Sequence, residues 1–322
     1  MPERVSAIIP TYNRADLLSR ALKSVARQDY RPIEAVVIDD GSTDSTPRVL
    51  DEARTMLGDA GVELVVRPQQ NQKAPAARNA GMKLARGALI AFLDSDDLWR
   101  PACISTLARL LEEHPSAGLA FCGIDVIDPD DRHVKFREMR LDDLPPTGLL
   151  PKPFDRIVRY MPFQTSGVMV RRSVIDRLGD FDLDLPVVED WDLWYRVSKL
   201  FDFAYTTQPL ACNREHPANL PKFSLLALRG NLRMNLRHLP DVRDPSGREA
   251  LAERIAWHIL LLQEELLRQG LSSNGYDEFL RHELAPRSMR YRLGRCMRWM
   301  PRFIGRAYAG LIRWMGRKSR NQ

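Results

Sequence analysis

Residues 88–99 read ALIAFLDSDDLW, a six-residue apolar run that passes directly into an acidic turn. An unbroken apolar run of this length is typical of a strand that is buried on both faces of a sheet. Similar runs occupy residues 5–9 (VSAII) and 33–38 (IEAVVI), and they end at Pro10 and at Asp39. The same arrangement, an apolar strand followed at once by a polar turn, therefore occurs three times.

Segments with helical spacing of apolar residues separate these strands. In residues 15–27, for example, apolar side chains recur every three or four positions. We expect strands at 5–9, 33–38, 62–66, 88–93 and 117–127, and helices at 15–27, 43–57, 76–85 and 101–113. This alternation predicts a doubly wound α/β sheet, which binds ligands at the carboxyl ends of its strands.

The pattern weakens after residue 127. Residues 128–165 are rich in Pro and Asp and predict long loops. We further expect strands at 166–170 and 211–214, a helix at 191–201 and a helical region at 222–285 with a break near 241–247. The resulting domain prediction is a catalytic domain at 1–220, a helical extension at 221–285 and a basic aromatic tail at 286–322.

The composition is that of a globular protein, with 322 residues of which 44% are hydrophobic and 28% charged. It excludes a collagen-like or wholly disordered chain. The cysteines at 103, 122, 212 and 296 form no CxxC pair, which argues against a disulfide scaffold or a Cys-rich zinc site and favours a reducing compartment. No apolar run approaches the roughly 20 residues of a spanning helix, and the N-terminus turns polar too early for a secretory signal. We therefore expect a cytoplasmic location.

The acidic turn at 94–97 has two interpretations on its own. Asp94 and Asp96 leave a buried strand two residues apart, so their carboxylates can point toward one site and hold Mg²⁺ or Mn²⁺ together with a diphosphate. The same residues also suit the start of a helix. Asp39 also has two interpretations. It can accept a hydrogen bond from a nucleobase or a ribose hydroxyl, or it can only stabilise the Asp-Gly turn.

Four stretches occur in a fixed order: VSAIIPTYNR (5–14), VIDDGSTD (37–44), ARNAG (77–81) and FLDSDDLW (92–99). Four more follow: SGVMVRR (166–172), GDFD (179–182), VEDWDLWYR (188–196) and REH (214–216). As an ordered set they resemble the family 2 glycosyltransferases over about residues 4–220. The resemblance implies the GT-A fold, a Rossmann-like mixed sheet with helices on both faces, followed here by a helical C-terminal region.

The resemblance also implies a role for each matching position. Asp190 would be the catalytic base, and Asp96 would coordinate a divalent cation, Mn²⁺ or Mg²⁺, with His216 as a further metal ligand. The donor nucleotide would contact Pro10, Thr11, Asn13, Arg14, Asp39, Arg78, Asn79, Asp94 and Ser95. Taken singly, Asp190 also fits an acidic helix start and His216 a surface histidine.

This division of roles suits the chemistry of sugar transfer. A carboxylate must remove the proton of the acceptor hydroxyl, and a cation must take up charge on the departing diphosphate. The resemblance implies a nucleotide-sugar donor, with UDP favoured, and a glycan or lipid-linked acceptor in surface polysaccharide synthesis, by single addition with inversion. The alternative is a catalytically inactive, membrane-associated scaffold or binding protein. The presence of all four acidic residues with implied roles argues against it: Asp39, Asp94, Asp96 and Asp190. No GxGxxG or P-loop motif occurs, which excludes those nucleotide-binding classes.

The tail at 286–322 has its own composition, in which Arg recurs every three or four residues among aromatic and aliphatic side chains. Since the whole chain carries +6 and residues 281–322 carry +11, the first 280 residues carry −5. This pattern is typical of a helix that lies on an anionic membrane surface. Packing against the acidic body and nucleic-acid binding are the alternatives. The aromatic content exceeds what phosphate binding needs, so we expect no nucleic acid and a peripheral position on the cytoplasmic face.

Overall fold

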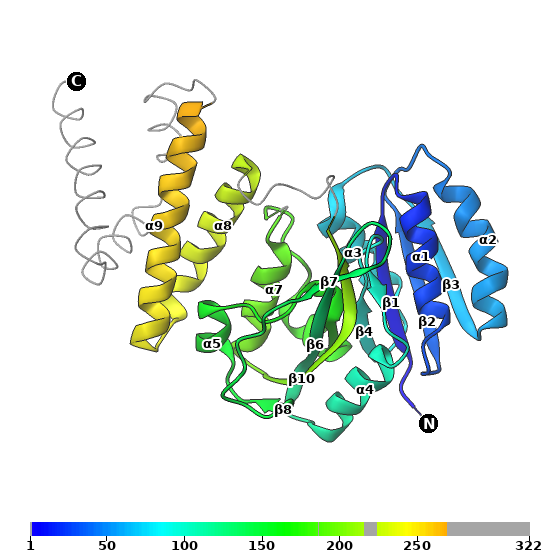
Figure 1. Ribbon diagram of the computed structural model, residues 1–322, viewed down its shortest axis with the longest axis horizontal. Helices are drawn as coiled ribbons and strands as arrows, with labels where there is room; N and C mark the ends of the chain where they lie inside the picture. The colour runs from blue at the N-terminus through cyan, green and yellow to red at the C-terminus, as the bar shows by residue number, and fades with distance from the viewer. Residues whose placement is uncertain (1, 186, 216–223, 269–322) are drawn as a thin grey trace. The chain divides into compact units, whose positions relative to one another are not determined.

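The computed structural model describes residues 2–185, 187–215 and 224–268. The chain divides into two compact units, Met1–Asn219 and Leu220–Gln322. The described part of the second unit consists of α8 (Leu225–His238), the 3₁₀ turn η2 (Leu239–Asp241) and α9 (Pro245–Arg268), and α8 contacts α9. The first unit contains the sheet and all the described residues of the predicted site (Figure 1).

The strands of the first unit are β1 (Val5–Thr11), β2 (Ile33–Asp39), β3 (Val62–Pro68), β4 (Leu89–Phe92), β5 (Leu98–Trp99), β6 (Ala117–Ile127), β7 (His133–Phe136), β8 (Thr147–Leu150), β9 (Val168–Arg171) and β10 (Asp202–Arg214). Within the described residues these ten strands form one mixed sheet, in the order β3-β2-β1-β4-β9-β6-β10-β5. Strand β7 pairs with β6, and β8 pairs with β10. The helices of this unit are α1 (Ala15–Ala26), α2 (Thr46–Asp59), α3 (Lys73–Leu84), α4 (Cys103–Glu113), α5 (Phe154–Arg159), η1 (Thr165–Gly167), α6 (Arg172–Leu178) and α7 (Glu189–Ser198).

Three neighbouring strands, β2, β1 and β4, are parallel. Their register decides which residues lie together at the carboxyl edge of the sheet. Thr11 pairs with Asp39 at the ends of β1 and β2, and Ile8 pairs with Phe92 at the end of β4. The carboxyl ends of the three strands therefore lie side by side. The polar turns that follow them converge at one edge, as in other open α/β sheets.

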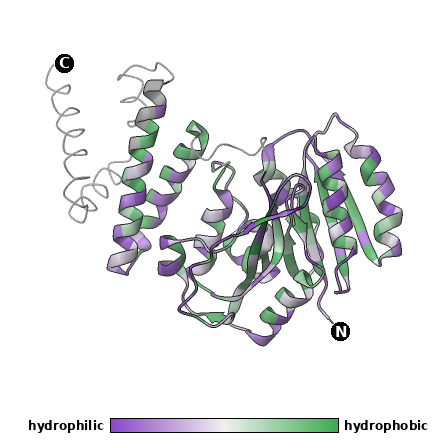
Figure 2. Ribbon diagram, in the orientation of Figure 1, coloured by the Kyte–Doolittle hydropathy of each residue, from purple (hydrophilic) through white to green (hydrophobic). Residues whose placement is uncertain are grey.

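Alternate residues of each strand face opposite helical layers. Val5, Ala7 and Ile9 pack in one core cluster with apolar side chains of α1, α2 and α4. On the other face, α3 lies so close to β1 that a Cβ at Gly81 would approach Ile8 Cγ2 to 2.6 Å. Figure 2 shows the hydrophobic residues concentrated in the strands between these layers. The predicted α/β class, with helices on both faces of a doubly wound sheet, is thus confirmed.

The expectations for the second half of the first unit need correction. Residues 128–165 contain β7, β8 and α5 in place of uninterrupted loops, and β7 is exposed along its length, which explains the missing apolar pattern. Strand β10 is far longer than the predicted 211–214. The prediction was too short because polar residues and register shifts between Tyr205 and Ala211 interrupt the apolar pattern of the strand. The predicted strand at 166–170 begins only at Val168, after η1.

Two further boundaries differ from the prediction. The helix predicted at 191–201 is α7, which begins two residues earlier and ends at Ser198. The break predicted near 241–247 begins at η2, and α9 starts at Pro245. None of the described helices is long and apolar enough to cross a membrane. The three described cysteines, Cys103, Cys122 and Cys212, are buried free thiols.

Candidate active site

The acidic turn at 94–97 does not cap a helix. It leads into the short strand β5, which pairs antiparallel with β10, and α4 begins only at Cys103. Asp97 donates its backbone N–H to the Asp94 carbonyl over 3.0 Å, which closes the turn. Ser95, Asp96 and Asp97 are all buried. The helix-start interpretation of this turn is therefore excluded, and the carboxylates lie at the carboxyl end of β4.

Asp96 forms an ion pair with Arg14, which stands at the N-terminal boundary of α1. The distance from Arg14 Nη1 to Asp96 Oδ2 is 2.5 Å. The pair forms because the turns after β1 and β4 are neighbours at the edge of the sheet. A predicted donor-binding residue and the predicted metal ligand thus lie together.

The donor set of the acidic turn fits a hard divalent cation. The carboxylates of Asp94 and Asp96 are oxygen ligands, and Asp96 already accommodates a positive group, the Arg14 guanidinium. Across the described residues, no group of three or more His, Cys, Asp or Glu side chains is arranged to hold a metal. Mg²⁺ is commonly bound through one or two carboxylates with the remaining ligands from phosphates and water, so this small set matches an ion shared with a diphosphate.

Arg78 connects the acidic turn to a second acidic centre. It projects from α3 and is buried, with Nη2 2.6 Å from Asp94 Oδ1 and Nη1 2.5 Å from Glu189 Oε1. Its guanidinium also lies over the ring of Phe181, 5.6 Å from the centroid. Burial opposes the charge of Arg78, but the carboxylates of Asp94, Glu189 and Asp190 outweigh it and raise the pKa. Arg78 is therefore a fixed positive charge between two groups of carboxylates.

Asp190 lies in the first turn of α7, next to Glu189. Thr165 Oγ1 donates to Asp190 Oδ2 over 2.7 Å, and the Trp191 backbone N–H donates to Oδ1 over 2.8 Å. Burial raises the pKa of Asp190, while Arg78 and the hydrogen bond from Thr165 oppose the rise. Burial likewise raises the pKa of Glu189 to about 7, although Arg78 lowers it. Interacting carboxyl groups of this kind titrate as a coupled set.

The turns that follow β1 and β2 are tied to each other through Asn13. Its backbone N–H donates to Ser42 Oγ over 2.9 Å, and its Oδ1 accepts from the Thr43 N–H over 2.7 Å. Asp39 Oδ1 accepts from the Ser42 N–H over 2.9 Å, so this residue does serve its turn. Beside it, the Thr11 hydroxyl is buried and has no hydrogen-bond partner within the described residues. Pro10 and Thr11 are both buried at this edge.

Asn79 makes its described contacts within the protein. Its Nδ2 donates to the Phe181 carbonyl over 2.9 Å, and its Oδ1 accepts from the Phe181 N–H over 3.0 Å. Asn79 thus holds the segment that places the Phe181 ring under Arg78. Its expected contact with the donor stays a prediction.

Several residues of the site were not predicted from the sequence. Asp97 accepts from Ser166 Oγ over 2.5 Å, and burial together with Asp96 and Asp94 raises its pKa to about 8. Arg214 is buried and donates from Nε to the Asp96 carbonyl over 2.9 Å. The available signal was their position, since all three belong to the motif stretches: Asp97, Ser166 and Arg214. Only the tertiary structure shows which groups they bind.

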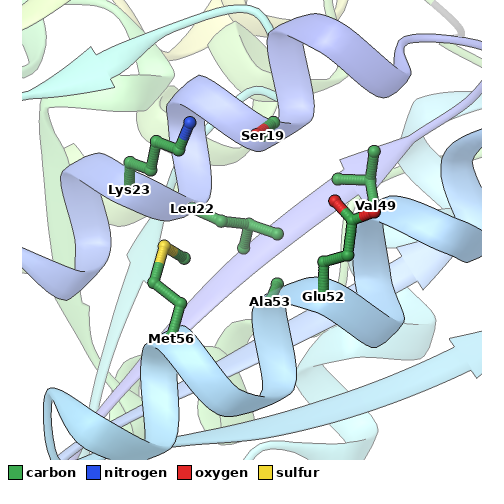
Figure 3. Close-up of a pocket in the computed structure, with 7 residues that line it drawn as sticks. All are labelled: Ser19, Leu22, Lys23, Val49, Glu52, Ala53 and Met56. Atoms are coloured by element: carbon green, nitrogen blue, oxygen red, sulfur yellow. The ribbon is translucent and has the colours of Figure 1, made fainter.

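Two predicted features lie outside the described residues: His216 and the tail at 286–322. A groove of about 210 Å³ lies between α1 and α2 and is drawn in Figure 3. It is lined by Ser19, Leu22, Lys23, Val49, Glu52, Ala53 and Met56, none of which is a predicted site residue. The groove therefore shares no lining residue with the acidic turn.

Known proteins resemble this chain in sequence. The sequence model for Glycosyl transferase family 2 matches residues 6–179, more than half of the chain. An uncharacterized glycosyltransferase of Nostoc sp. is 31% identical over 232 residues, which cover 67% of this chain and 66% of that protein. The succinoglycan biosynthesis protein ExoO of Rhizobium meliloti is 34% identical over 196 residues, which cover 59% of this chain and 54% of ExoO.

Solved structures show the same fold. TarS 1-349 of S. aureus, crystallised in complex with UDP, has a TM-score of 0.66 at 19% identity, with 92% of this chain and 83% of that chain covered. The mannosyltransferase PcManGT from Pyrobaculum calidifontis, in complex with GDP-Man and Mn²⁺, has a TM-score of 0.58 at 21% identity, with 92% of this chain and 84% of that chain covered.

Proposed function

Because the chain belongs to glycosyl transferase family 2 and is a glycosyltransferase, we propose that it moves a sugar from a UDP-sugar to a hydroxyl of a glycan or lipid-linked acceptor. The observation that carries this proposal is the pair of acidic centres on either side of Arg78. One contains Asp94 and Asp96, and the other contains Glu189 and Asp190. Sugar transfer needs a place for the donor diphosphate and a separate base, and this arrangement offers both.

The donor nucleotide would lie on the turns that follow β1, β2 and β4. Thr11, whose hydroxyl has no partner among the described residues, is paired in register with Asp39 there, and both side chains can bind polar groups of a nucleoside. Arg14 would contact the diphosphate. The complexes of TarS with UDP and UDP-GlcNAc support UDP as the nucleotide.

Asp96, assisted by Asp94, would hold Mn²⁺ or Mg²⁺, with His216 as a further ligand. When bound, the ion supplies positive charge to the departing diphosphate. The Mn²⁺ in the complex of PcManGT supports this choice of cofactor. The protein supplies charge of its own nearby through Arg14 and Arg78, which orient the carboxylates before the donor arrives.

Asp190 would accept the proton of the acceptor hydroxyl while that oxygen attacks the anomeric carbon. Its raised pKa suits a base that must hold this proton during transfer. Attack from the face opposite the diphosphate inverts the anomeric configuration. A catalytically inactive scaffold is the less favoured alternative, because Asp39, Asp94, Asp96 and Asp190 are all present.

The acceptor would be a glycan under construction, extended by one sugar, as part of surface polysaccharide synthesis. The similarity to a succinoglycan biosynthesis protein supports this substrate class. A lipid-linked acceptor would also explain a tail that docks on the cytoplasmic face of a membrane. Sedimentation with anionic vesicles tests this docking: the full chain should pellet, and a chain that ends at residue 285 should stay in the supernatant. Equal pelleting of both forms would remove the tail from the proposal.

A thermal-shift screen tests the donor and the metal together. UDP-, GDP- and dTDP-sugars are each added with and without Mn²⁺, and Asp96→Asn serves as the control. A ligand present at 100 times its Kd stabilises the folded state by about 2.7 kcal/mol, which gives a measurable rise in Tm. We expect a Mn²⁺-dependent rise with UDP-sugars that is lost in the variant. No rise with any nucleotide sugar would contradict the proposed function.

A further inference from the structure

The 3₁₀ turn η1 contains two adjacent hydroxyl side chains that reach different parts of the site. Thr165 contacts Asp190, and Ser166 contacts the acidic turn. Both residues are buried, with exposed fractions of 4% and 2%. One short turn therefore contacts both acidic centres.

On the donor side, Ser166 acts through three hydrogen bonds. Its Oγ donates to Asp97 Oδ2 over 2.5 Å and accepts from the Asp94 N–H over 3.2 Å. Its carbonyl accepts from Trp99 Nε1 over 2.6 Å. Ser166 thus binds the first residue of the acidic turn, its last residue and Trp99 just beyond it, so this one serine braces the backbone of the turn that carries Asp94 and Asp96.

On the other side, Thr165 holds the catalytic carboxylate. Its hydroxyl donates to Asp190 Oδ2 over 2.7 Å, while Oδ1 is bound by the Trp191 N–H. Both carboxylate oxygens therefore have a donor, which fixes the rotation of the side chain. The Thr165 hydroxyl bonds to the charged form of Asp190, so it favours ionisation of the base.

The sheet holds η1 in place. Strand β9 starts directly after the turn and runs antiparallel to both β4 and β6, so η1 lies where β4 ends. A Cβ at Gly167 would lie 2.9 Å from Ile124 Cδ1 and 3.3 Å from Cys122 Sγ, so this end of the turn is packed closely on β6. A turn with so little space can serve as a fixed support for the groups that it binds.

We propose that Thr165 and Ser166 are positioning residues that set the catalytic base and the donor-binding turn relative to each other. This inference rests on the proposed function, because it takes Asp190 as the base and the acidic turn as the donor site. Neither residue touches the reacting atoms. Thr165 acts through Asp190, and Ser166 acts through Asp94 and Asp97.

Thr165→Val tests the first half. Valine has the shape of threonine without the hydroxyl, and Thr165→Ser restores the hydroxyl. Among the described residues, the charged groups that face Asp190 are Arg78, Glu189 and Asp94, and all three remain in these variants. The titration of Asp190 is followed by ¹³C NMR of labelled aspartate carboxyl groups, with the signal identified by its loss in Asp190→Asn. We expect the Asp190 midpoint to rise by about one pH unit in Thr165→Val and to return in Thr165→Ser.

Ser166→Ala tests the second half, and Ser166→Cys, a close match in shape with a weak donor, replaces it if the alanine variant does not fold. We expect the Kd for UDP-sugar to increase about tenfold by calorimetry while the Asp190 titration stays as in the wild type. Thr206→Val is the matched control for both halves: Thr206 is a buried threonine whose hydroxyl bonds Thr147, and neither readout should change.

The outcomes separate this inference from the proposed function. An unchanged Asp190 midpoint in Thr165→Val, or unchanged donor affinity in Ser166→Ala, overturns the positioning role even though the wild type binds and turns over a donor. Failure of the wild type to bind any nucleotide sugar overturns the proposed function, and the donor half of the inference with it. The NMR titration still decides the Thr165 half, because it needs neither donor nor acceptor.

Discussion

The guanidinium of Arg14 lies against the carboxylate of Asp96, with 2.5 Å between Nη1 and Oδ2. The residue that would bind the donor diphosphate thus neutralises the residue that would bind the metal. On the proposed function, a divalent ion at Asp96 would compete with Arg14 for the same oxygen. Arrival of the ion would then free Arg14 to turn to the phosphates, and the ion pair would link metal binding to donor binding.

Arg14→Gln should separate these two events. Without Arg14, one competitor for Asp96 Oδ2 is gone, so Mn²⁺ should bind several-fold more tightly in the absence of donor, while UDP-sugar should bind more weakly. Calorimetric titration of Mn²⁺ and then of donor measures both. Arg20→Gln, which replaces a partly buried arginine of α1 that pairs with Asp131, is the control. Weaker Mn²⁺ binding in Arg14→Gln would show that the pair does not compete with the ion.

Asp96→Asn should abolish the metal dependence of donor binding. The amide keeps the size of the side chain but removes the negative charge that a hard cation needs. Equilibrium binding of UDP-sugar with and without Mn²⁺ checks this, with the exposed Asp59→Asn on α2 as the control. A wild-type response to Mn²⁺ in Asp96→Asn would show that the metal is bound by other residues.

Asp190→Asn should abolish transfer and leave donor binding intact. The amide cannot accept the proton of the acceptor hydroxyl, but it can still accept the hydrogen bonds of Thr165 or Trp191 with its oxygen. Turnover and donor Kd are measured on the same preparation, with the exposed Asp176→Asn on α6 as the control. Substantial turnover in Asp190→Asn would assign the base to another residue.

Turnover should fall on the acid side at a pH above the ordinary pKa of aspartic acid, about 3.9. Burial raises the pKa of Asp190, so the proposed base would become protonated and inactive as the pH falls through this raised value. Glu189, with a pKa of about 7, shares the site, so the acid limb reports the pair. A profile of kcat at saturating donor from about pH 4.5 to 8.5 checks this. An acid limb at the ordinary value would contradict it.

The same raised pKa values predict how stability changes with pH. The folded protein holds protons on Glu189 and Asp190 that the unfolded chain would release, so this contribution to stability is present at low pH. It is lost as the pH rises through the folded pKa of Glu189, about 7. Urea unfolding of the wild type and of Glu189→Gln across this range separates the contribution of Glu189 from those of other groups.

Arg78→Met should destabilise the first unit strongly. Removing one partner of a buried ion pair typically costs about 3–5 kcal/mol, because the remaining charge is left buried. Here Asp94 and Glu189 would both lose their cation. Arg48→Met, which breaks an exposed pair with Glu52 on α2, should cost under about 1 kcal/mol. Urea unfolding measures both variants, and equal losses would show that Arg78 has no special role.

The amino-acid sequence predicted the first half of the sheet well, for a simple physical reason. Strands β1, β2 and β4 are buried on both faces, so each is an apolar run that ends in a polar turn. Strand β7 is exposed, and β10 is irregular between Tyr205 and Ala211, so neither has a pattern that could be read. A regular buried strand leaves an apolar pattern in the sequence, whereas exposure of β7 and the register shifts of β10 remove it.

The motif stretches also pointed to the acidic turn and to Asp190, because each chemical role demands a particular kind of side chain. What the sequence could not show is which of these side chains meet. Arg78 binds Glu189 across 111 positions, and Ser166 binds Asp97 across 69. These contacts arise because β4 lies beside β9 and because α3 packs close to β1 over Gly81. The residue types were set along the chain, but the hydrogen bond from Thr165 to Asp190 and the pairing of Arg14 with Asp96 came only from packing between distant segments.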